Sequence, residues 1–252
     1  MSARTLLLLG DPQQLPQVSQ GTHPEPVDGS ALGFLSDGQD VLPPELGYFL
    51  AESRRMHPAV AEVISELSYA GALHAHASAA RRHLEGVAPG VHVVPVEHVG
   101  NAVDSSEEAA QVVHLIQELV GAGWRASPHG STKALHDSDV IVVTPYNAQQ
   151  RLVREHLDAA GLQGTRVGTV DKFQGQEAVV AIVSLCASSA AEVPRGMDFL
   201  LNRNRLNVAI SRAQWAAFVV FSPALVDFLP RSAEGVAELS AFLRVVEASA
   251  RH

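Results

Sequence analysis

Arginine, glutamine and glutamate side chains in short polar segments are the groups of this chain best suited to chemistry. Arg55 and Arg212 each stand in such a segment, and Glu177 closes another that begins at Gly168. Phosphoryl transfer depends mainly on positioning and on neutralising negative charge. Guanidinium groups bind phosphate through paired N–H donors. We therefore expect these arginines to act on a phosphate group.

Five short segments carry the candidate residues. They are residues 10–16 (GDPQQLP), 53–58 (SRRMHP), 144–149 (TPYNAQ), 168–177 (GTVDKFQGQE) and 204–213 (NRLNVAISRA). In the last segment apolar residues recur at i, i+3, i+4 and i+7 from Leu206, which predicts a helix over residues 201–213. Arg205 and Arg212 would then lie almost in line along the edge of this helix. We expect both arginines to reach sideways from it into a cleft between domains.

The sequence does not contain the loop that usually holds the phosphates of ATP. That loop needs the pattern Gly-x-x-x-x-Gly-Lys-Ser/Thr, in which backbone N–H groups and the lysine meet the phosphate charge. The only lysines are Lys133 and Lys172, preceded by Thr132 and Asp171. The sequence therefore predicts no phosphate loop of this kind within these residues.

Alternating apolar runs and helical patterns indicate the fold. Runs typical of buried parallel strands cover residues 6–9, 140–143, 179–185 and 216–221, with a weaker one at 91–96. Helical patterns cover residues 105–120, 147–160, 201–213 and about 233–248. The first of these opens with Ser105 and Glu108 at the spacing of a capping box. This alternation predicts an α/β fold with a doubly wound parallel sheet.

The order of these elements suggests three parts. Residues 1–16 hold a buried-type strand with nothing before it, so we assign them to the end of a first domain. Residues 17–45 are rich in proline and glycine and read as an irregular connection. Residues 46–252 form the main α/β domain. The loop at 75–90, which holds Arg81, Arg82 and His83, is expected to be a surface excursion.

Composition limits the possible functions. The formal net charge is −9, from 18 basic and 27 acidic residues, so contact with nucleic acid should be confined to a local groove. The single cysteine, Cys186, excludes an internal disulfide and is expected to be buried. No apolar run approaches the ~18–20 residues of a membrane span, so we expect a cytoplasmic protein with no membrane contact. The spacing of His74, His76 and His83 fits no common metal site, and we predict none.

In their order and separation, the five segments resemble those of superfamily 1 helicases of the 1B branch, the group of the RNA-surveillance and DNA-replication helicases. The resemblance covers roughly residues 6–221. It implies two RecA-like domains of the P-loop NTPase fold with ATP and Mg²⁺ between them, and this chain would supply the second domain. The metal ligands, the phosphate loop and the catalytic acids would belong to a missing N-terminal domain, joined in cis or in trans.

The resemblance also implies roles for single residues. Gln14 matches a glutamine that senses the γ-phosphate, Arg55 an arginine that contacts it, and Arg212 the arginine finger. Glu177 matches the acid that holds the ribose, and Gly175 and Arg205 lie in the same nucleotide-facing segments. Many relatives have an adenine-stacking tyrosine where this chain has Arg54, although a guanidinium can also stack on a base.

Contacts with nucleic acid are implied for a second group of residues. Thr144, Pro145, Tyr146 and Thr169 match positions where the family touches the backbone of single-stranded nucleic acid, and we favour DNA as the track. Our prediction is thus the C-terminal half of an ATP-dependent helicase or translocase, inactive toward ATP as an isolated chain.

Alternatives remain open at the level of residues and of function. Arg205 could be a surface salt-bridge partner, Gln14 could cap a turn, and Glu177 could be a solvated acid. Tyr146 could equally well pack under its helix. The whole chain could be a non-catalytic remnant or a subunit that docks a partner ATPase domain. A helicase half fused to an upstream nuclease is a further alternative.

Overall fold

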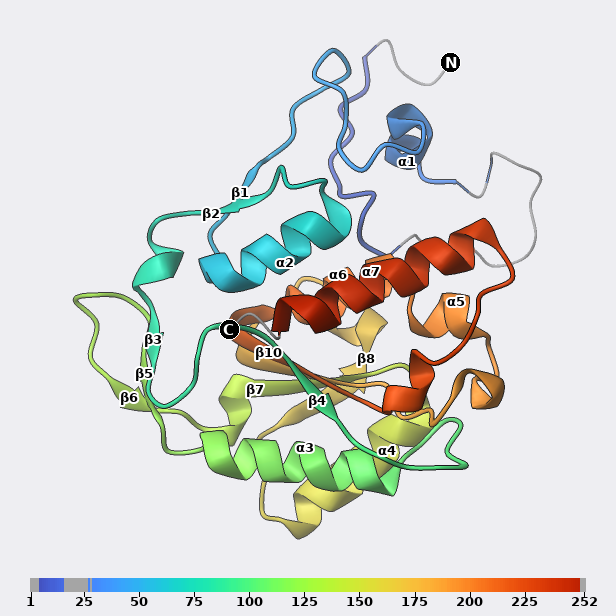
Figure 1. The fold of residues 1–252 in the computed structure, drawn as a ribbon. Helices are drawn as coiled ribbons and strands as arrows, with labels where there is room; N and C mark the ends of the chain where they lie inside the picture. Colours follow the sequence, from blue (N-terminus) through green and yellow to red (C-terminus); the bar gives the residue numbers. More distant parts are fainter. Residues whose placement is uncertain (1–4, 16–26, 28, 250–252) are drawn as a thin grey trace.

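A five-stranded parallel sheet forms the centre of the molecule in a computed structural model that describes residues 5–15, 27 and 29–249 (Figure 1). Its strand order is β4-β10-β9-β7-β8, and every neighbouring pair is parallel. The strands are β4 Gly90–Pro95, β7 Val140–Thr144, β8 Arg166–Thr169, β9 Ala178–Ser184 and β10 Ala213–Phe221.

Helices cover both faces of this sheet, which confirms the predicted doubly wound α/β fold and agrees with a RecA-like domain (Figure 1). Helices α2, α6 and α7 contribute to the core on one face, and α3 and α4 to the core on the other. The helices are α1 Ala31–Ser36, α2 Pro58–Ser68, α3 Ser106–Leu119, α4 Asn147–Ala159, α5 Met197–Leu200, α6 Arg203–Ile210 and α7 Ala233–Ser249.

Short elements complete the described chain. Strands β1 Glu52–Ser53 and β2 His74–Ala75 pair in parallel. Strands β3 His83–Leu84, β5 Gly123–Arg125 and β6 Lys133–Ala134 form a small antiparallel sheet. The 3₁₀ turns are η1 Ala79–Arg81, η2 Asp137–Asp139, η3 Val170–Phe173, η4 Ala190–Glu192 and η5 Pro223–Leu225.

The central strand β9 shows why unbroken apolar runs form this sheet. All of its residues are buried, because helices cover both of its faces. Ala181 and Val183 pack into the core beside α2 and α6, whereas Val180 and Ile182 pack into the core beside α3 and α4. Burial of each large aliphatic side chain stabilises the fold by about 1.5–3 kcal/mol. None of the helices in the described residues is long and apolar enough to cross a membrane.

The strand predicted at residues 6–9 is not formed. These residues have no assigned secondary structure, and Leu7 and Leu9 are 82% and 84% exposed. A strand needs a neighbour to satisfy its backbone N–H and C=O groups, and no described segment pairs with this one. The sequence pattern nevertheless located the other four predicted strands correctly and missed only β8 among the central strands.

The helix predicted over residues 201–213 is shorter than expected. It begins at Arg203 and ends at Ile210, Ser211 is its C-cap, and Ala213 already belongs to β10. Ala213 lies in register with Ala178 of β9, so sheet pairing takes this end of the segment away from the helix. The other three predicted helices are confirmed as α3, α4 and α7.

Helix α3 begins with half of the predicted capping box. The Ser105 hydroxyl accepts a 3.1 Å hydrogen bond from the backbone N–H of Glu108, as expected for an N-cap. The Glu108 carboxylate does not return to the backbone of Ser105. It is fully buried and accepts hydrogen bonds from the end of β9 instead.

Candidate nucleotide and nucleic-acid site

The predicted site residues lie at the two ends of the parallel strands. We call the side of the sheet where the strands begin the amino edge and the side where they end the carboxyl edge. Glu177 and Arg212 directly precede β9 and β10, so they lie at the amino ends of these strands. Thr144 and Thr169 end β7 and β8 and lie in register with each other. In a parallel sheet these positions mark opposite edges, because all strands run in one direction. The residues between Thr169 and Glu177 run from one edge to the other.

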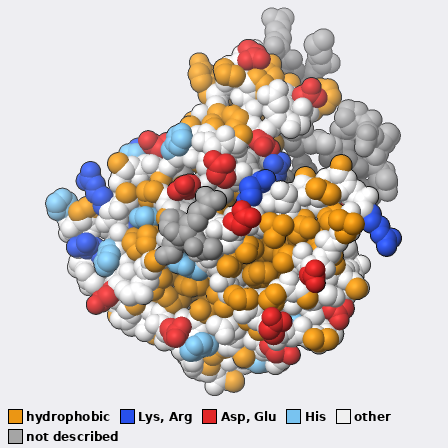
Figure 2. All heavy atoms as spheres, viewed as in Figure 1, with side chains coloured by type: hydrophobic (Ala, Val, Ile, Leu, Met, Phe, Trp, Pro, Cys, Tyr) orange, Lys and Arg blue, Asp and Glu red, His pale blue; other side chains and the backbone are white. Residues whose placement is uncertain are grey.

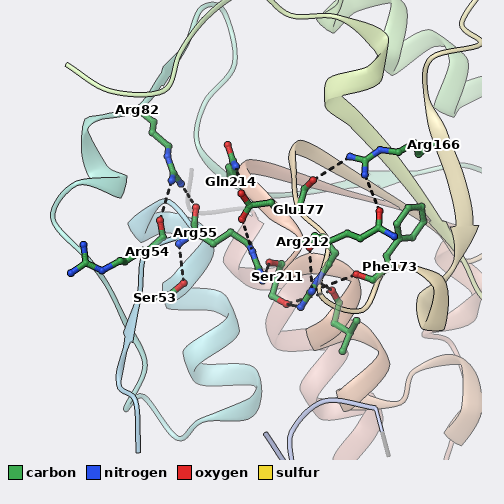
Figure 3. A network of polar contacts seen from close by, with 12 residues as sticks. Ser53, Arg54, Arg55, Arg82, Arg166, Phe173, Glu177, Ser211, Arg212 and Gln214 are labelled. Carbon is green, nitrogen blue, oxygen red and sulfur yellow. Dashed lines mark hydrogen bonds and ion pairs between the residues drawn. The ribbon is translucent and has the colours of Figure 1, made fainter. Parts of the chain in front are cut away.

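At the amino edge, Arg55 and Glu177 form an ion pair with an Nε to Oε2 distance of 3.0 Å (Figure 3). Arg55 also donates to the carbonyl oxygen of Ser211 at 3.3 Å. The other oxygen of Glu177 accepts a 2.9 Å hydrogen bond from Gln214. The side chains of Arg55 and Glu177 are 29% and 49% exposed, so both remain open to a ligand.

Arg212 does not reach into an open cleft, contrary to the expectation from its sequence. Its side chain is buried, and its Nε donates to the carbonyl oxygen of Val208 at 2.8 Å. Its remaining nitrogens donate to the carbonyl oxygens of Phe173 and Gln176 and to the hydroxyl of Ser211 (Figure 3). Burial, and next the positive charge of Arg55, lower the pKa of Arg212 to about 10. The guanidinium therefore stays charged at neutral pH while bonded to backbone carbonyls.

Two further arginines join this edge and were not predicted. Arg82 donates to the carbonyl oxygens of Arg54 and Arg55, and burial lowers its pKa. Arg166 donates to the carbonyl oxygen of Glu177 at 3.2 Å. We call Arg55, Arg82, Arg166, Glu177 and Arg212 the arginine cluster. Its four guanidinium groups and one carboxylate leave an excess of positive charge, which suits an anionic ligand.

Two other predicted nucleotide residues flank the arginine cluster. The side chain of Arg54 is exposed, and its carbonyl oxygen accepts a 3.0 Å hydrogen bond from Arg82. Gly175 has φ of +79°, a left-handed conformation that favours glycine. It lies in the turn between Phe173 and Gln176, whose carbonyl groups accept from Arg212.

Gln14 lies beside α6 and does not contact the arginine cluster directly. Its side-chain amide donates to the carboxylate of Asp11 at 2.8 Å. Asn204 donates to the carbonyl oxygens of Pro12 and Gln14, and Asn207 donates to that of Gln13. The segment around Gln14 is thus fastened to α6 by two asparagine side chains.

At the carboxyl edge, the four predicted nucleic-acid residues lie together. Thr144 is buried, and its hydroxyl donates to the carbonyl oxygen of Tyr146 at 3.2 Å, which shapes the turn into α4. Tyr146 is partly buried, and its ring lies 5.6 Å from that of Phe199. We call Thr144, Pro145, Tyr146 and Thr169 the threonine edge. A small apolar pocket beside it is lined by Thr144, Pro145, Phe199 and Arg205 among others.

Arg205 belongs to the carboxyl edge and not to the arginine cluster. Its guanidinium carbon lies 4.3 Å from the ring centre of Phe199, and it forms a 3.9 Å ion pair with Asp171. The predicted alignment of Arg205 with Arg212 fails because Arg212 follows the end of α6. Arg205 therefore forms an ion pair and also covers an aromatic ring.

The described residues hold no group of three or more His, Cys, Asp or Glu side chains placed to bind a metal ion. On the face drawn in Figure 2, Lys and Arg side chains are scattered among Asp, Glu and His side chains and form no large basic patch.

Comparisons with known proteins identify the family to which this chain belongs. A family model described as an AAA domain matches residues 36–223. DNA-binding protein SMUBP-2 of Rattus norvegicus is 29% identical over 93% of this chain and 25% of its own length. DNA polymerase alpha-associated DNA helicase A of Schizosaccharomyces pombe is 40% identical over 42% of this chain and 14% of its own length.

Regulator of nonsense transcripts 1 of Caenorhabditis elegans is 29% identical over 66% of this chain and 16% of its own length. The chain thus spans a quarter or less of the length of these three relatives. Because the family match covers most of the chain, this protein belongs to the AAA-domain family, and its similarities place it with the superfamily 1 helicases.

Proposed function

We propose that this chain acts as the second RecA-like domain of an ATP-dependent helicase or translocase that moves on single-stranded nucleic acid, with DNA as the favoured track. The observation that carries this proposal is the convergence of Arg55, Glu177 and Arg212 from three distant segments at one edge of the sheet. The chain would complete an ATP site whose phosphate loop and Mg²⁺ ligands belong to a partner domain, in cis or in trans.

Each member of the arginine cluster has a role that suits its exposure. Glu177, which is half exposed, would accept hydrogen bonds from the ribose hydroxyl groups of ATP. Arg55 would donate to the γ-phosphate, because its guanidinium lies at the surface and carries a single ion pair. Arg54 would stack on the adenine. Hydrolysis of the γ-phosphate bond supplies the free energy for movement, and these side chains bind and orient the nucleotide.

Arg212 would act as the arginine finger after a change of partners. Its N–H groups now donate to the carbonyl oxygens of Phe173 and Gln176. Phosphate oxygens carry more negative charge than carbonyl oxygens and form shorter, stronger hydrogen bonds with guanidinium. Binding of the γ-phosphate would therefore compete with the turn at residues 173–176. Release of that turn would link nucleotide binding to the segment that leads back to Thr169.

Gln14 would transmit the state of the nucleotide to the nucleic acid through α6. The carbonyl groups around it are bonded to Asn204 and Asn207 on that helix. Arg205 of the same helix faces the threonine edge. A shift of the segment at residues 11–14 would therefore move residues that face the nucleic acid.

The test is ATP hydrolysis by this chain joined to an ATP-binding RecA-like domain, with single-stranded DNA present. We expect Arg212→Ala to lower kcat on the order of 10³-fold, the usual cost of losing an arginine finger. Arg55→Gln serves as a second variant because Arg55 is not buried, so its loss should leave folding intact. Arg244→Gln, at an exposed position of α7, is the matched control and should keep the wild-type rate.

Two outcomes would contradict this proposal. Steady ATP turnover by the purified chain alone would show that no partner domain is needed. A near-wild-type rate from both Arg212→Ala and Arg55→Gln in the joined protein would remove their catalytic roles.

A second candidate function is a non-catalytic module that docks a partner ATPase domain. The burial of Arg212 and its four bonds within the chain favour this alternative, because a guanidinium so placed can be purely structural. Such a module would capture an ATP-binding domain in size-exclusion chromatography, and its Arg212→Ala variant would lose stability without changing the partner's ATP turnover.

A further inference from the structure

Phe199 and two arginines form a stack beside the threonine edge. The guanidinium carbons of Arg195 and Arg205 lie 3.7 and 4.3 Å from the centre of the Phe199 ring. The ring of Tyr146 lies 5.6 Å from the same ring. Arg195 and Phe199 both lie outside the five segments, so no motif predicts a role for them.

The two arginines in this stack differ in their carboxylate partners. Arg195 is exposed and has no carboxylate partner within 4.0 Å among the residues that the structure describes. Arg205 is half-buried, and burial lowers its pKa; the carboxylate of Asp171 acts against this shift, and the nearby charge of Arg195 acts with it. Two like charges thus meet over one aromatic ring in a chain whose net charge is −9. An anionic ligand would relieve their repulsion.

We propose that Phe199 and Arg195 form a stacking platform for a base of single-stranded nucleic acid, next to the backbone contacts of the threonine edge. This inference rests on the proposed function and specifies how the strand would be held. Guanidinium and aromatic planes are the surfaces on which proteins stack unpaired bases.

Arg205 and Arg195 differ in exposure, so we expect them to play different roles in the platform. Arg205 is held by Asp171 and lines the apolar pocket together with Thr144 and Pro145, so it anchors the inner side of the stack. Arg195 is exposed, so its guanidinium can leave the ring to pair with a phosphate, and the face of Phe199 that it now covers would then accept a base. A nucleotide has both a base that stacks and a phosphate that carries charge, and this platform offers a partner for each.

The platform can be tested by photochemical crosslinking with the whole chain. Oligothymidine and oligouridine that contain 5-iodouracil would be irradiated with the protein, and crosslinked peptides identified by mass spectrometry. Trypsin cuts after Arg195 and Arg203, so Phe199 lies in a short peptide, residues 196–203, in which it is the only aromatic residue. We expect this peptide to carry the crosslink. The two oligonucleotides distinguish DNA from RNA as the source of the base.

Affinity measurements by fluorescence anisotropy complete the test. Phe199→Leu keeps an apolar side chain but removes the ring, so we expect the affinity to fall about 5- to 150-fold, the equivalent of about 1–3 kcal/mol per stacked base. Arg195→Gln should weaken binding and make it less dependent on salt. Phe228→Leu and Arg244→Gln make the same exchanges at a partly buried and an exposed position elsewhere, and should bind like the wild type.

The possible failures of the two proposals differ. If the wild-type chain crosslinks only through other peptides and Phe199→Leu binds normally, the platform is wrong while nucleic-acid binding stands. If the wild-type chain neither binds nor crosslinks at any protein concentration used, the nucleic-acid contact in the proposed function fails together with the platform.

Discussion

Replacement of Glu108 by alanine should destabilise the fold strongly, because its carboxylate is the centre of a buried polar network. The side chain is 0% exposed. One oxygen accepts from the hydroxyl of Ser184 at 2.7 Å and from the backbone N–H of Cys186 at 3.0 Å. The other lies 3.1 Å from Nε2 of His98. Helix α3 is thereby fastened to the carboxyl end of β9.

The size of the effect follows from the groups that lose their partner. Alanine would leave the Cys186 N–H and the Ser184 hydroxyl without an acceptor, and each buried unpaired donor costs about 1–3 kcal/mol. Together with the contact to His98, the expected loss is about 3–5 kcal/mol, typical for removal of one partner of a buried charged network. Glu108→Gln keeps the shape and one acceptor oxygen, so about 1–2 kcal/mol should be lost.

Urea unfolding followed by circular dichroism measures both variants. Glu107→Ala is the matched control one residue earlier: its carboxylate is exposed and accepts hydrogen bonds from Asn101 and Ser105, so its loss should cost less than about 1 kcal/mol. If Glu108→Ala unfolds at the same urea concentration as Glu107→Ala, the buried network does not stabilise the fold and the reasoning is refuted.

Three other positions give shorter predictions. Burial and the charge of Arg82 lower the pKa of His57, whose Nδ1 accepts from the backbone N–H of Ala59. The folded state therefore favours the neutral ring, and this contribution to stability is complete above the ordinary pKa of 6.5 and is lost as pH falls through the lowered value. Between pH 7 and pH 5, the free energy of unfolding measured in urea should therefore fall more for the wild type than for His57→Asn, and equal losses would contradict this. Burial raises the pKa of the Cys186 thiol, so a thiol reagent should label it only as fast as the chain unfolds, and rapid labelling of folded protein would count against it. Gly175→Ala should cost about 1–2 kcal/mol in thermal unfolding, because φ is +79° and only backbone strain opposes a Cβ there; Gly175→Asn should cost less.

The sequence predicts most of the sheet, because strands buried on both faces need unbroken apolar runs. Strands β7 and β9 were recognisable for this reason. Strand β8 contains arginine, glycine and threonine in only four residues, so no pattern marked it. The run at residues 6–9 has the pattern of a buried strand but stays exposed. An apolar run favours a buried strand, but the strand forms only where a neighbouring strand can pair with it.

The site was only partly predictable from the five segments. The motif resemblance identified Arg55 and Glu177, which the structure joins across 122 residues of sequence. Arg82 and Arg166 were missed because their contacts depend on tertiary structure; the basic run at residues 81–83 was the only available signal for Arg82. The assignment of roles to these residues remains a prediction.

The end of α6 decides how the two arginines of the last segment can act. A regular helix would place Arg205 and Arg212 on one edge, facing one ligand. Because α6 ends at Ile210, Arg205 faces Phe199 at the carboxyl edge while Arg212 turns back to the carbonyl group of Val208 at the amino edge. Eight helical residues span about 12 Å at 1.5 Å per residue. In the proposed function, this short helix, with Arg205 in its first turn and Arg212 just beyond its end, would link a phosphate at one edge of the sheet to a nucleic-acid strand at the other.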